Sequence, residues 1–196
     1  IYKNKEFRKN RKMLQMTRQM IFQDSASSLN PRMKIEDIVA EPLRIYSGKG
    51  RPGKKEIEKQ IELVGLDRSY MEKYPCELSG GQRQRVAIAR ALSTKPELIV
   101  ADEPIASLDV SIQAQMVNLF RKLQKEQGFS FLFIAHDLSM VEFLCDRTGV
   151  MYHGKLVEEG RTQDIFAHPE HEYTKALLAA VPIPDPRIER QKGEVL

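Results

Sequence analysis

The stretch Leu78-Ser79-Gly80-Gly81-Gln82 decides the fold, because a strongly helical run follows it directly and continues to Leu92. Ser79 can cap this helix, and the two glycines leave backbone N–H groups uncovered where the helix dipole is positive. Such a helix start suits an anion, above all a phosphate. Ser-Gly-Gly also occurs in ordinary loops, so the neighbouring segments have to decide between the two interpretations.

The next segment, residues 98–101, is short and apolar and predicts a buried strand that ends at Asp102 and Glu103. An aspartate at the carboxyl end of a parallel strand is well placed to hold magnesium. Glu103 should point to the other side, where it can orient and deprotonate a water molecule. Paired acids at a strand end can also be plain surface charge, but the strand before them and Pro104 behind them favour a catalytic site.

Two more strands are predicted, at residues 19–22 and 129–135. The first is followed by Gln23, and a glutamine at a strand end is usually a surface residue. The second is a run of aromatic and aliphatic residues that predicts a buried strand, and it leads to His136. A lone histidine is more often structural than catalytic, but this one leaves a core strand as the acidic pair does. We therefore keep His136 as a candidate site residue.

Two apparent motifs elsewhere in the chain are rejected. Residues 48–54, between helical pieces of the segment 35–77, nominally fit Gly-x-x-x-x-Gly-Lys, but Lys55 stands where a serine or threonine must hold magnesium. Pro52 also removes an N–H group from the loop. Residues 168–172 contain two histidines and two glutamates without evident further ligands, so we read them as the start of the helix expected at 173–181. A hairpin with a two-residue turn is predicted at 148–159.

The composition is that of a soluble globular protein, with 41% hydrophobic and 30% charged residues in 196. No apolar run approaches the roughly 18 residues of a membrane helix, and the polar, basic start does not resemble a signal peptide. Two cysteines are too few for a disulfide framework, so we expect reduced thiols in a cytosolic setting. A net charge of +4 does not by itself indicate binding of nucleic acid. The basic stretch at 3–18 also lacks the interleaved aromatic residues on which bases could stack.

Taken together, the sequence resembles the ATP-binding cassette (ABC) ATPases. Residues 78–82 resemble the family's signature motif, residues 98–103 its Walker B strand, and residues 107–109 its D-loop, with Ala106 and Ser107 in swapped order. Gln23 is similar to the Q-loop glutamine and His136 to the switch histidine. Three segments resemble the oligopeptide, dipeptide and nickel importer branch in sequence: residues 22–32, residues 110–115 and the Pro-rich end.

The resemblance implies an α/β fold: a P-loop NTPase (RecA-like) core with the ABC helical subdomain, incomplete at the N-terminus. It implies one ABC domain over residues 1–196. The helical subdomain with the signature would occupy residues 35–92. Walker B, the D-loop and the switch histidine would lie in 93–160, and a C-terminal helix with a Pro-rich extension in 161–196.

The implied ligands are ATP and Mg²⁺, held between two cassettes. Asp102 and Gln23 would hold the metal, while Glu103, His136 and Gln23 would act on the attacking water and the γ-phosphate. The residues implied to meet the nucleotide or the opposing subunit from the other cassette are Ser79, Gly80, Gly81, Gln82 and Asp109.

The implied function is that of the ATPase subunit that powers an importer of oligopeptides, dipeptides or nickel, at the cytoplasmic face of the membrane. Its partners would be a second ABC ATPase subunit, two transmembrane permease subunits and, indirectly, a substrate-binding protein, with no nucleic acid. The alternative is a non-transport ABC ATPase acting on nucleic acid or ribosomes. Such proteins usually carry coiled-coil or zinc insertions, and neither heptads nor paired Cys-x-x-Cys occur here.

The family's phosphate loop, Gly-x-x-x-x-Gly-Lys-Ser/Thr on a strand before the Q-loop, does not occur in this sequence. Gln23 already belongs to the Q-loop, so we expect the missing loop upstream of Ile1 and a chain truncated at its N-terminus. That loop supplies the backbone cradle, the phosphate lysine and one magnesium ligand. We therefore expect these residues alone to bind ATP weakly and not to hydrolyse it.

Overall fold

The computed structural model describes residues 5–47 and 52–180. The chain divides into two compact units, residues 1–135 and 136–196, and each is described by itself. The finer division expected from the sequence stays a prediction. The Pro-rich extension and most of the rejected loop at 48–54 lie outside the described residues.

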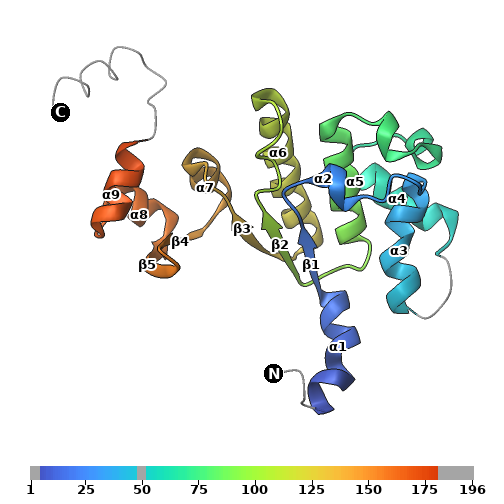
Figure 1. Ribbon diagram of the computed structural model, residues 1–196, viewed down its shortest axis with the longest axis horizontal. Helices are drawn as coiled ribbons and strands as arrows, with labels where there is room; N and C mark the ends of the chain where they lie inside the picture. Colours follow the sequence, from blue (N-terminus) through green and yellow to red (C-terminus); the bar gives the residue numbers. More distant parts are fainter. Residues whose placement is uncertain (1–4, 48–51, 181–196) are drawn as a thin grey trace. The chain divides into compact units, whose positions relative to one another are not determined.

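The first unit contains a three-stranded parallel sheet (Figure 1). Its strands are β1 (Arg18–Ile21), β2 (Leu98–Asp102) and β3 (Ser130–Ile134), in the order β1-β2-β3. Both pairings are parallel, so the carboxyl ends of the strands share one edge of the sheet. The three strands expected from apolar runs are therefore present, each within two residues of its predicted bounds.

The other elements of this unit are mostly helical. They are α1 (Lys5–Thr17), α2 (Ser25–Ser28), α3 (Ile35–Ser47), α4 (Lys54–Leu63), the short 3₁₀ helices η1 (Arg68–Glu72) and η2 (Pro75–Glu77), α5 (Gly80–Leu92) and α6 (Val110–Gln127). The signature helix expected after residue 79 is α5.

Only one face of the sheet is covered by the described helices. On that face Ile99 is fully buried, and the Phe120 ring of α6 packs edge-on against Phe131, with centroids 5.2 Å apart. On the other face Leu132 keeps 53% of its surface exposed and Ile134 keeps 46%. The expectation of a buried strand at 129–135 was therefore wrong for the face with Leu132 and Ile134, because a continuous apolar run predicts burial without showing what covers each face.

Arginines of α5 tie the first unit together. Arg85 donates to the carbonyl oxygen of Val64 and Arg90 to that of Ser28, each at 2.6 Å. Burial lowers the pKa of the Arg90 guanidinium, and nearby Glu41 partly opposes this shift. The bond from Arg90 joins α5 to α2, directly after the loop that carries Gln23, so it fixes that loop to the helical part of the unit.

Replacing Arg90 by methionine should therefore destabilise the protein. The variant leaves a carbonyl oxygen and the Glu41 carboxylate without the guanidinium, and we expect the free energy of unfolding to fall by about 1–3 kcal/mol. Urea unfolding of the complete protein measures this change, with Lys125→Met on the exposed surface of α6 as the matched control. Equal unfolding midpoints for the two variants would show that the Ser28 bond does not stabilise the fold.

The described part of the second unit, residues 136–180, contains a hairpin and three helices. Strands β4 (Arg147–Tyr152) and β5 (Lys155–Arg161) pair antiparallel, and Tyr152 faces Lys155 across the predicted two-residue turn. Both turn residues have left-handed backbones, with φ of 47° at His153 and 76° at Gly154, as such a turn requires. The helices are α7 (Leu138–Leu144), α8 (Thr162–Ala167) and α9 (Glu172–Ala179).

Glu158 holds the segment before α9 onto the hairpin. Its carboxylate accepts the backbone N–H of Glu170 at 2.9 Å and that of His171 at 3.1 Å. The bond from Glu170 is the main cause that lowers the pKa of Glu158. Because the folded-state pKa is lowered, this stabilisation is present above the unfolded value of about 4.3 and is lost as the pH falls through the folded value.

The protection of these two amides should therefore fall in acid. We expect the protection factors of the Glu170 and His171 amides to decrease below about pH 4, and the Glu158→Gln variant to lose this pH dependence. Hydrogen exchange followed by NMR measures both, with Glu159→Gln, whose carboxylate pairs with Arg147 at 2.8 Å, as the control. Constant protection from pH 6 to pH 3 would contradict the assigned role of Glu158.

Candidate active site

Gln23 and Glu103 meet at the shared edge of the parallel sheet. Gln23 follows β1 and Glu103 follows β2, and the side-chain Nε2 of Gln23 donates to the Glu103 carboxylate at 3.0 Å. Asp102, the last residue of β2, lines the same hollow as Gln23. The structure therefore brings together three of the predicted site residues, although 80 positions separate Gln23 from Glu103 in the chain.

The backbone of Glu103 is left-handed, with φ of 41°. A glutamate in this region is strained, and such strain persists only where the surroundings fix it. Here the Glu103 N–H donates to the carbonyl oxygen of Ile134 at the end of β3, at 2.9 Å. The left-handed backbone at Glu103 interrupts the simple strand alternation assumed for Asp102 and Glu103. That their carboxylates point to opposite sides stays a prediction.

The donor set of this cluster suits a magnesium ion. Magnesium prefers oxygen ligands, and Asp102 offers a carboxylate to the hollow that Gln23 also lines. Because Nε2 of Gln23 donates to Glu103, its Oε1 remains on the other branch of the amide as an acceptor. The chemistry of Asp102 and Gln23 therefore fits the predicted metal site. Among the described residues no three His, Cys, Asp or Glu side chains gather into a metal site formed by protein alone.

The start of α5 has the geometry expected for the signature. Ser79 caps the helix, and a capping box links it to Gln82: Oγ of Ser79 accepts the Gln82 N–H at 3.4 Å, and Oε1 of Gln82 accepts the Ser79 N–H at 2.9 Å. The next two N–H groups, of Gly80 and Gly81, have no acceptor within a helix. They lie at its positive end, where an anion is favoured.

The two signature glycines lie against the segment that carries Asp109. A Cβ on Gly80 would meet Leu108 Cδ2 at 3.4 Å, and one on Gly81 would meet Ile112 Cγ2 at only 2.8 Å. Asp109 is the N-cap residue directly before α6, is exposed, and makes no capping hydrogen bond with its side chain. The residues expected to face an opposing cassette thus form a second cluster within the same unit.

His136 lies two residues beyond the end of β3 and begins the second unit. Its side chain is exposed. Its position at the γ-phosphate, beside Glu103, stays a prediction.

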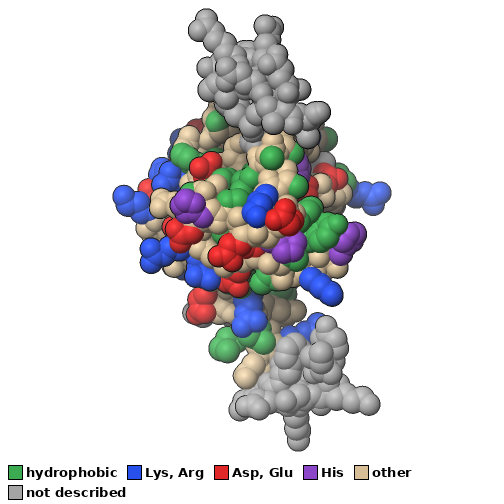
Figure 2. All heavy atoms as spheres, turned by 90° about the vertical axis from the view of Figure 1, so that its left-hand side faces the viewer, with side chains coloured by type: hydrophobic (Ala, Val, Ile, Leu, Met, Phe, Trp, Pro, Cys, Tyr) green, Lys and Arg blue, Asp and Glu red, His purple; other side chains and the backbone are tan. Residues whose placement is uncertain are grey.

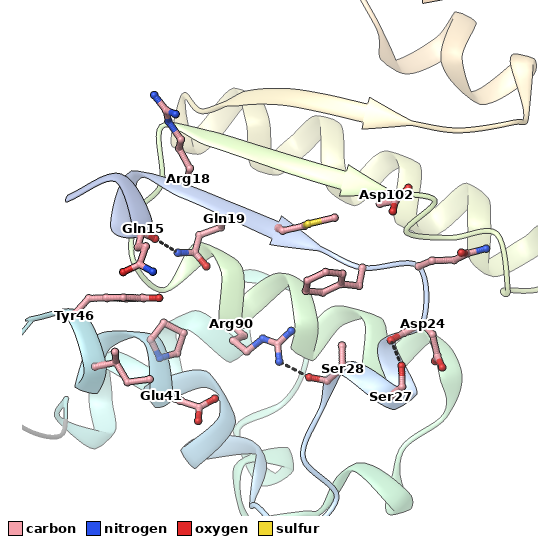
Figure 3. Close-up of a pocket in the computed structure, with 15 residues that line it drawn as sticks. Gln15, Arg18, Gln19, Asp24, Ser27, Ser28, Glu41, Tyr46, Arg90 and Asp102 are labelled. Atoms are coloured by element: carbon pink, nitrogen blue, oxygen red, sulfur yellow. Dashed lines mark hydrogen bonds between the residues drawn. The ribbon is translucent and has the colours of Figure 1, made fainter. Parts of the chain in front are cut away.

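An open hollow of about 760 Å³ is lined at one end by Gln23 and Asp102 (Figure 3). It runs from Gln23 and Asp102 along β1 to Glu41 and Tyr46 of α3. Figure 3 shows its hydrogen bonds, from Arg90 to Ser28, from Gln19 to the carbonyl of Gln15 and from Ser27 to that of Asp24. Sequence reasoning missed the part that Arg90 plays here, because no local motif marks a side chain that bonds a distant carbonyl.

The charges on the face drawn in Figure 2 are mixed. Aspartate and glutamate lie mainly in the middle of that face, with lysine and arginine around them and histidines nearby, so its described residues form no continuous basic patch. Within the described part of the chain, no helix is both long and apolar enough to span a bilayer.

Comparison with known proteins adds independent evidence. The family model described as ABC transporter matches residues 1–106, and the model described as Oligopeptide/dipeptide transporter, C-terminal region, matches residues 157–196. The oligopeptide transport ATP-binding protein OppF of Bacillus subtilis is 55% identical over 188 residues, covering 93% of this chain and 61% of the relative. OppF of Streptococcus mutans is 55% identical over 176 residues, 89% of this chain and 57% of the relative. The dipeptide transport ATP-binding protein DppF of Lactococcus lactis is 51% identical over 181 residues, 91% of this chain and 58% of the relative.

The chain therefore spans between 57% and 61% of the length of these relatives. The matches confirm the resemblance to the oligopeptide and dipeptide branch, and with the parallel sheet they confirm the α/β fold class of the P-loop NTPases. The first unit carries an acid–amide pair and a helix that starts with two glycines, and their roles as Walker B and signature motifs stay predictions. This chain belongs to the ABC transporter family.

Proposed function

We propose that the complete protein is the ATP-hydrolysing subunit of an importer of oligopeptides or dipeptides. The observation that carries this proposal is the contact between Gln23 and Glu103 at the sheet edge, 3.0 Å apart, in a chain whose relatives are named for peptide transport. The carboxylate and the amide lie close enough for both to contact one water molecule beside their hydrogen bond, which is what hydrolysis of a phosphoanhydride requires. Nickel as cargo stays an untested part of the sequence prediction.

In this mechanism Glu103 accepts the proton of the attacking water, and Gln23 holds both the water and the Glu103 carboxylate in place. His136 would bond the γ-phosphate and keep the water in line. Asp102 and the free oxygen of Gln23 would hold the magnesium ion. When bound, that ion neutralises the charge that develops on the phosphate oxygens.

The second cluster would act on a different nucleotide. Ser79, Gly80 and Gly81 present a hydroxyl and two N–H groups, while Asp109 lies on the adjoining segment. We propose that these groups meet the ATP held by the acid–amide cluster of a partner cassette, so that the site is complete only when two cassettes close. Phosphoryl transfer depends on positioning and electrostatics, so closure then controls turnover.

The closed pair would drive two permease subunits from the cytoplasmic face of the membrane. We propose that the permease subunits contact the loop after Gln23 and the adjoining hollow. Arg90 lines this hollow and donates to the carbonyl oxygen of Ser28. We also propose that the phosphate loop, absent from these 196 residues, belongs to a further part of the complete protein. The relatives are long enough to hold such a part.

The experiment is reconstitution of the complete protein with its co-purifying membrane subunits in vesicles. We expect ATP-dependent accumulation of a labelled oligopeptide and stoichiometric phosphate release. If the complete protein purifies with ribosomes or nucleic acid instead, and its ATPase rate responds to them alone, the transport function is wrong.

A further inference from the structure

The capping box at the start of α5 extends to a third side chain, Tyr70. The side-chain Nε2 of Gln82 donates to the Tyr70 hydroxyl at 2.9 Å, while Oε1 of the same amide accepts the Ser79 N–H. A backbone N–H can only donate, so the amide oxygen must face Ser79 and the amide nitrogen must face Tyr70. Both ends of the Gln82 side chain are thus engaged within this unit.

Tyr70 is itself held in place by its surroundings. It lies in η1, whose first residues are fixed by Asp67, which accepts the Ser69 N–H at 2.8 Å. The Lys73 ammonium lies 4.1 Å from the centroid of the Tyr70 ring, in the geometry of a cation–π contact. The hydroxyl is therefore presented to Gln82 by a side chain with little freedom of its own.

We propose that Tyr70 and Gln82 are positioning residues for the phosphate-facing end of α5, and that Gln82 does not itself contact the nucleotide. This inference rests on the proposed function. The chain of bonds runs from the Tyr70 hydroxyl through the Gln82 amide to the Ser79 N–H, and it fixes the backbone from which the Ser79 hydroxyl and the two glycine N–H groups project. Donors fixed before the reaction stabilise developing charge better than mobile ones.

The removal of one hydroxyl tests the inference. Tyr70→Phe keeps the ring and its contact with Lys73 but leaves Nε2 of Gln82 without its acceptor, so the amide can turn to water and release the Ser79 N–H. We expect the Ser79 amide to exchange about fivefold faster, the value of one hydrogen bond of about 1 kcal/mol. Tyr74→Phe, in the same segment, is the control, because the hydroxyl that Gln82 contacts is that of Tyr70.

Turnover provides the second measurement. In the complete protein assembled with its partners, we expect Tyr70→Phe to lower kcat about fivefold and to leave the ATP affinity of the unassembled subunit unchanged. In a Gln82→Met background the same substitution should not lower kcat further, because the relay, the chain of hydrogen bonds from Tyr70 through Gln82 to Ser79, is already broken. A merely structural role would instead lower the melting temperature and spare kcat below it.

The two measurements separate the possible failures. Unchanged exchange at Ser79 in Tyr70→Phe overturns the positioning role, whatever the protein does with ATP. Faster exchange with unchanged kcat also overturns it, because the cap then does not limit turnover. If the parent protein hydrolyses no ATP in its assembly, the proposed function fails. In that case faster exchange at Ser79 still supports the relay as a structural device but overturns its part in catalysis.

Discussion

The Glu103→Gln variant of the complete protein should bind ATP as the parent does and hydrolyse it about 10²- to 10⁴-fold more slowly, the usual contribution of a general base. The amide is nearly isosteric with the carboxylate, so Gln23 keeps a partner at about the 3.0 Å seen here. It cannot take a proton from water. We expect the paired cassettes to remain closed on unhydrolysed ATP.

Phosphate release and nucleotide retention after gel filtration measure the two halves of this result. Glu62→Gln, on the exposed surface of α4, is the control for charge and should hydrolyse ATP at the parental rate. A Glu103→Gln variant that hydrolyses as fast as the parent would exclude Glu103 as the base. One that no longer binds ATP would assign it to binding instead.

The second large effect is expected from Gly81→Ala. Replacing glycine by alanine in a helix ordinarily stabilises it, by about 1 kcal/mol. Here the new Cβ would lie 2.8 Å from Ile112 Cγ2, a branched and stiff side chain, so the start of α5 must shift. A misplacement of about 1 Å at a catalytic surface costs about 100-fold in rate, and we expect a loss of that size in ATP hydrolysis.

Two further variants make this prediction specific. Gly80→Ala meets Leu108 at 3.4 Å, close to ordinary contact, and should lose far less activity. Adding Ile112→Ala to Gly81→Ala removes the clashing methyl group and should restore most of the rate. If the double variant stays as slow as Gly81→Ala alone, the glycine serves another purpose than packing against α6.

Much of the fold could be predicted because short apolar runs were followed by polar residues at the three strand ends. The parallel sheet then brings Gln23 and Glu103 together without further information. Two features had no local signal. The left-handed backbone of Glu103 depends on its bond to Ile134, and the link from Tyr70 to Gln82 spans 12 positions between separate elements.

The exposed face of the sheet was mispredicted for a related physical reason. Leu132 and Ile134 belong to an apolar run that is typical of a strand buried on both faces, yet the described helices cover only one. A sequence shows which residues avoid water, but the element that covers them is set by packing. The place of His136 beside Glu103 stays a prediction for the same reason, since it depends on how separate elements pack.

We propose that residues of two cassettes bind each ATP, and a structure of the complete Glu103→Gln assembly with ATP and magnesium would reveal these contacts. We expect oxygens of one γ-phosphate to lie about 3 Å from Ser79 Oγ and the Gly81 N–H of one cassette, while Asp102 and Gln23 of the other hold the magnesium ion. A γ-phosphate whose contacts all come from a single cassette, with Ser79 far from any nucleotide, would contradict it.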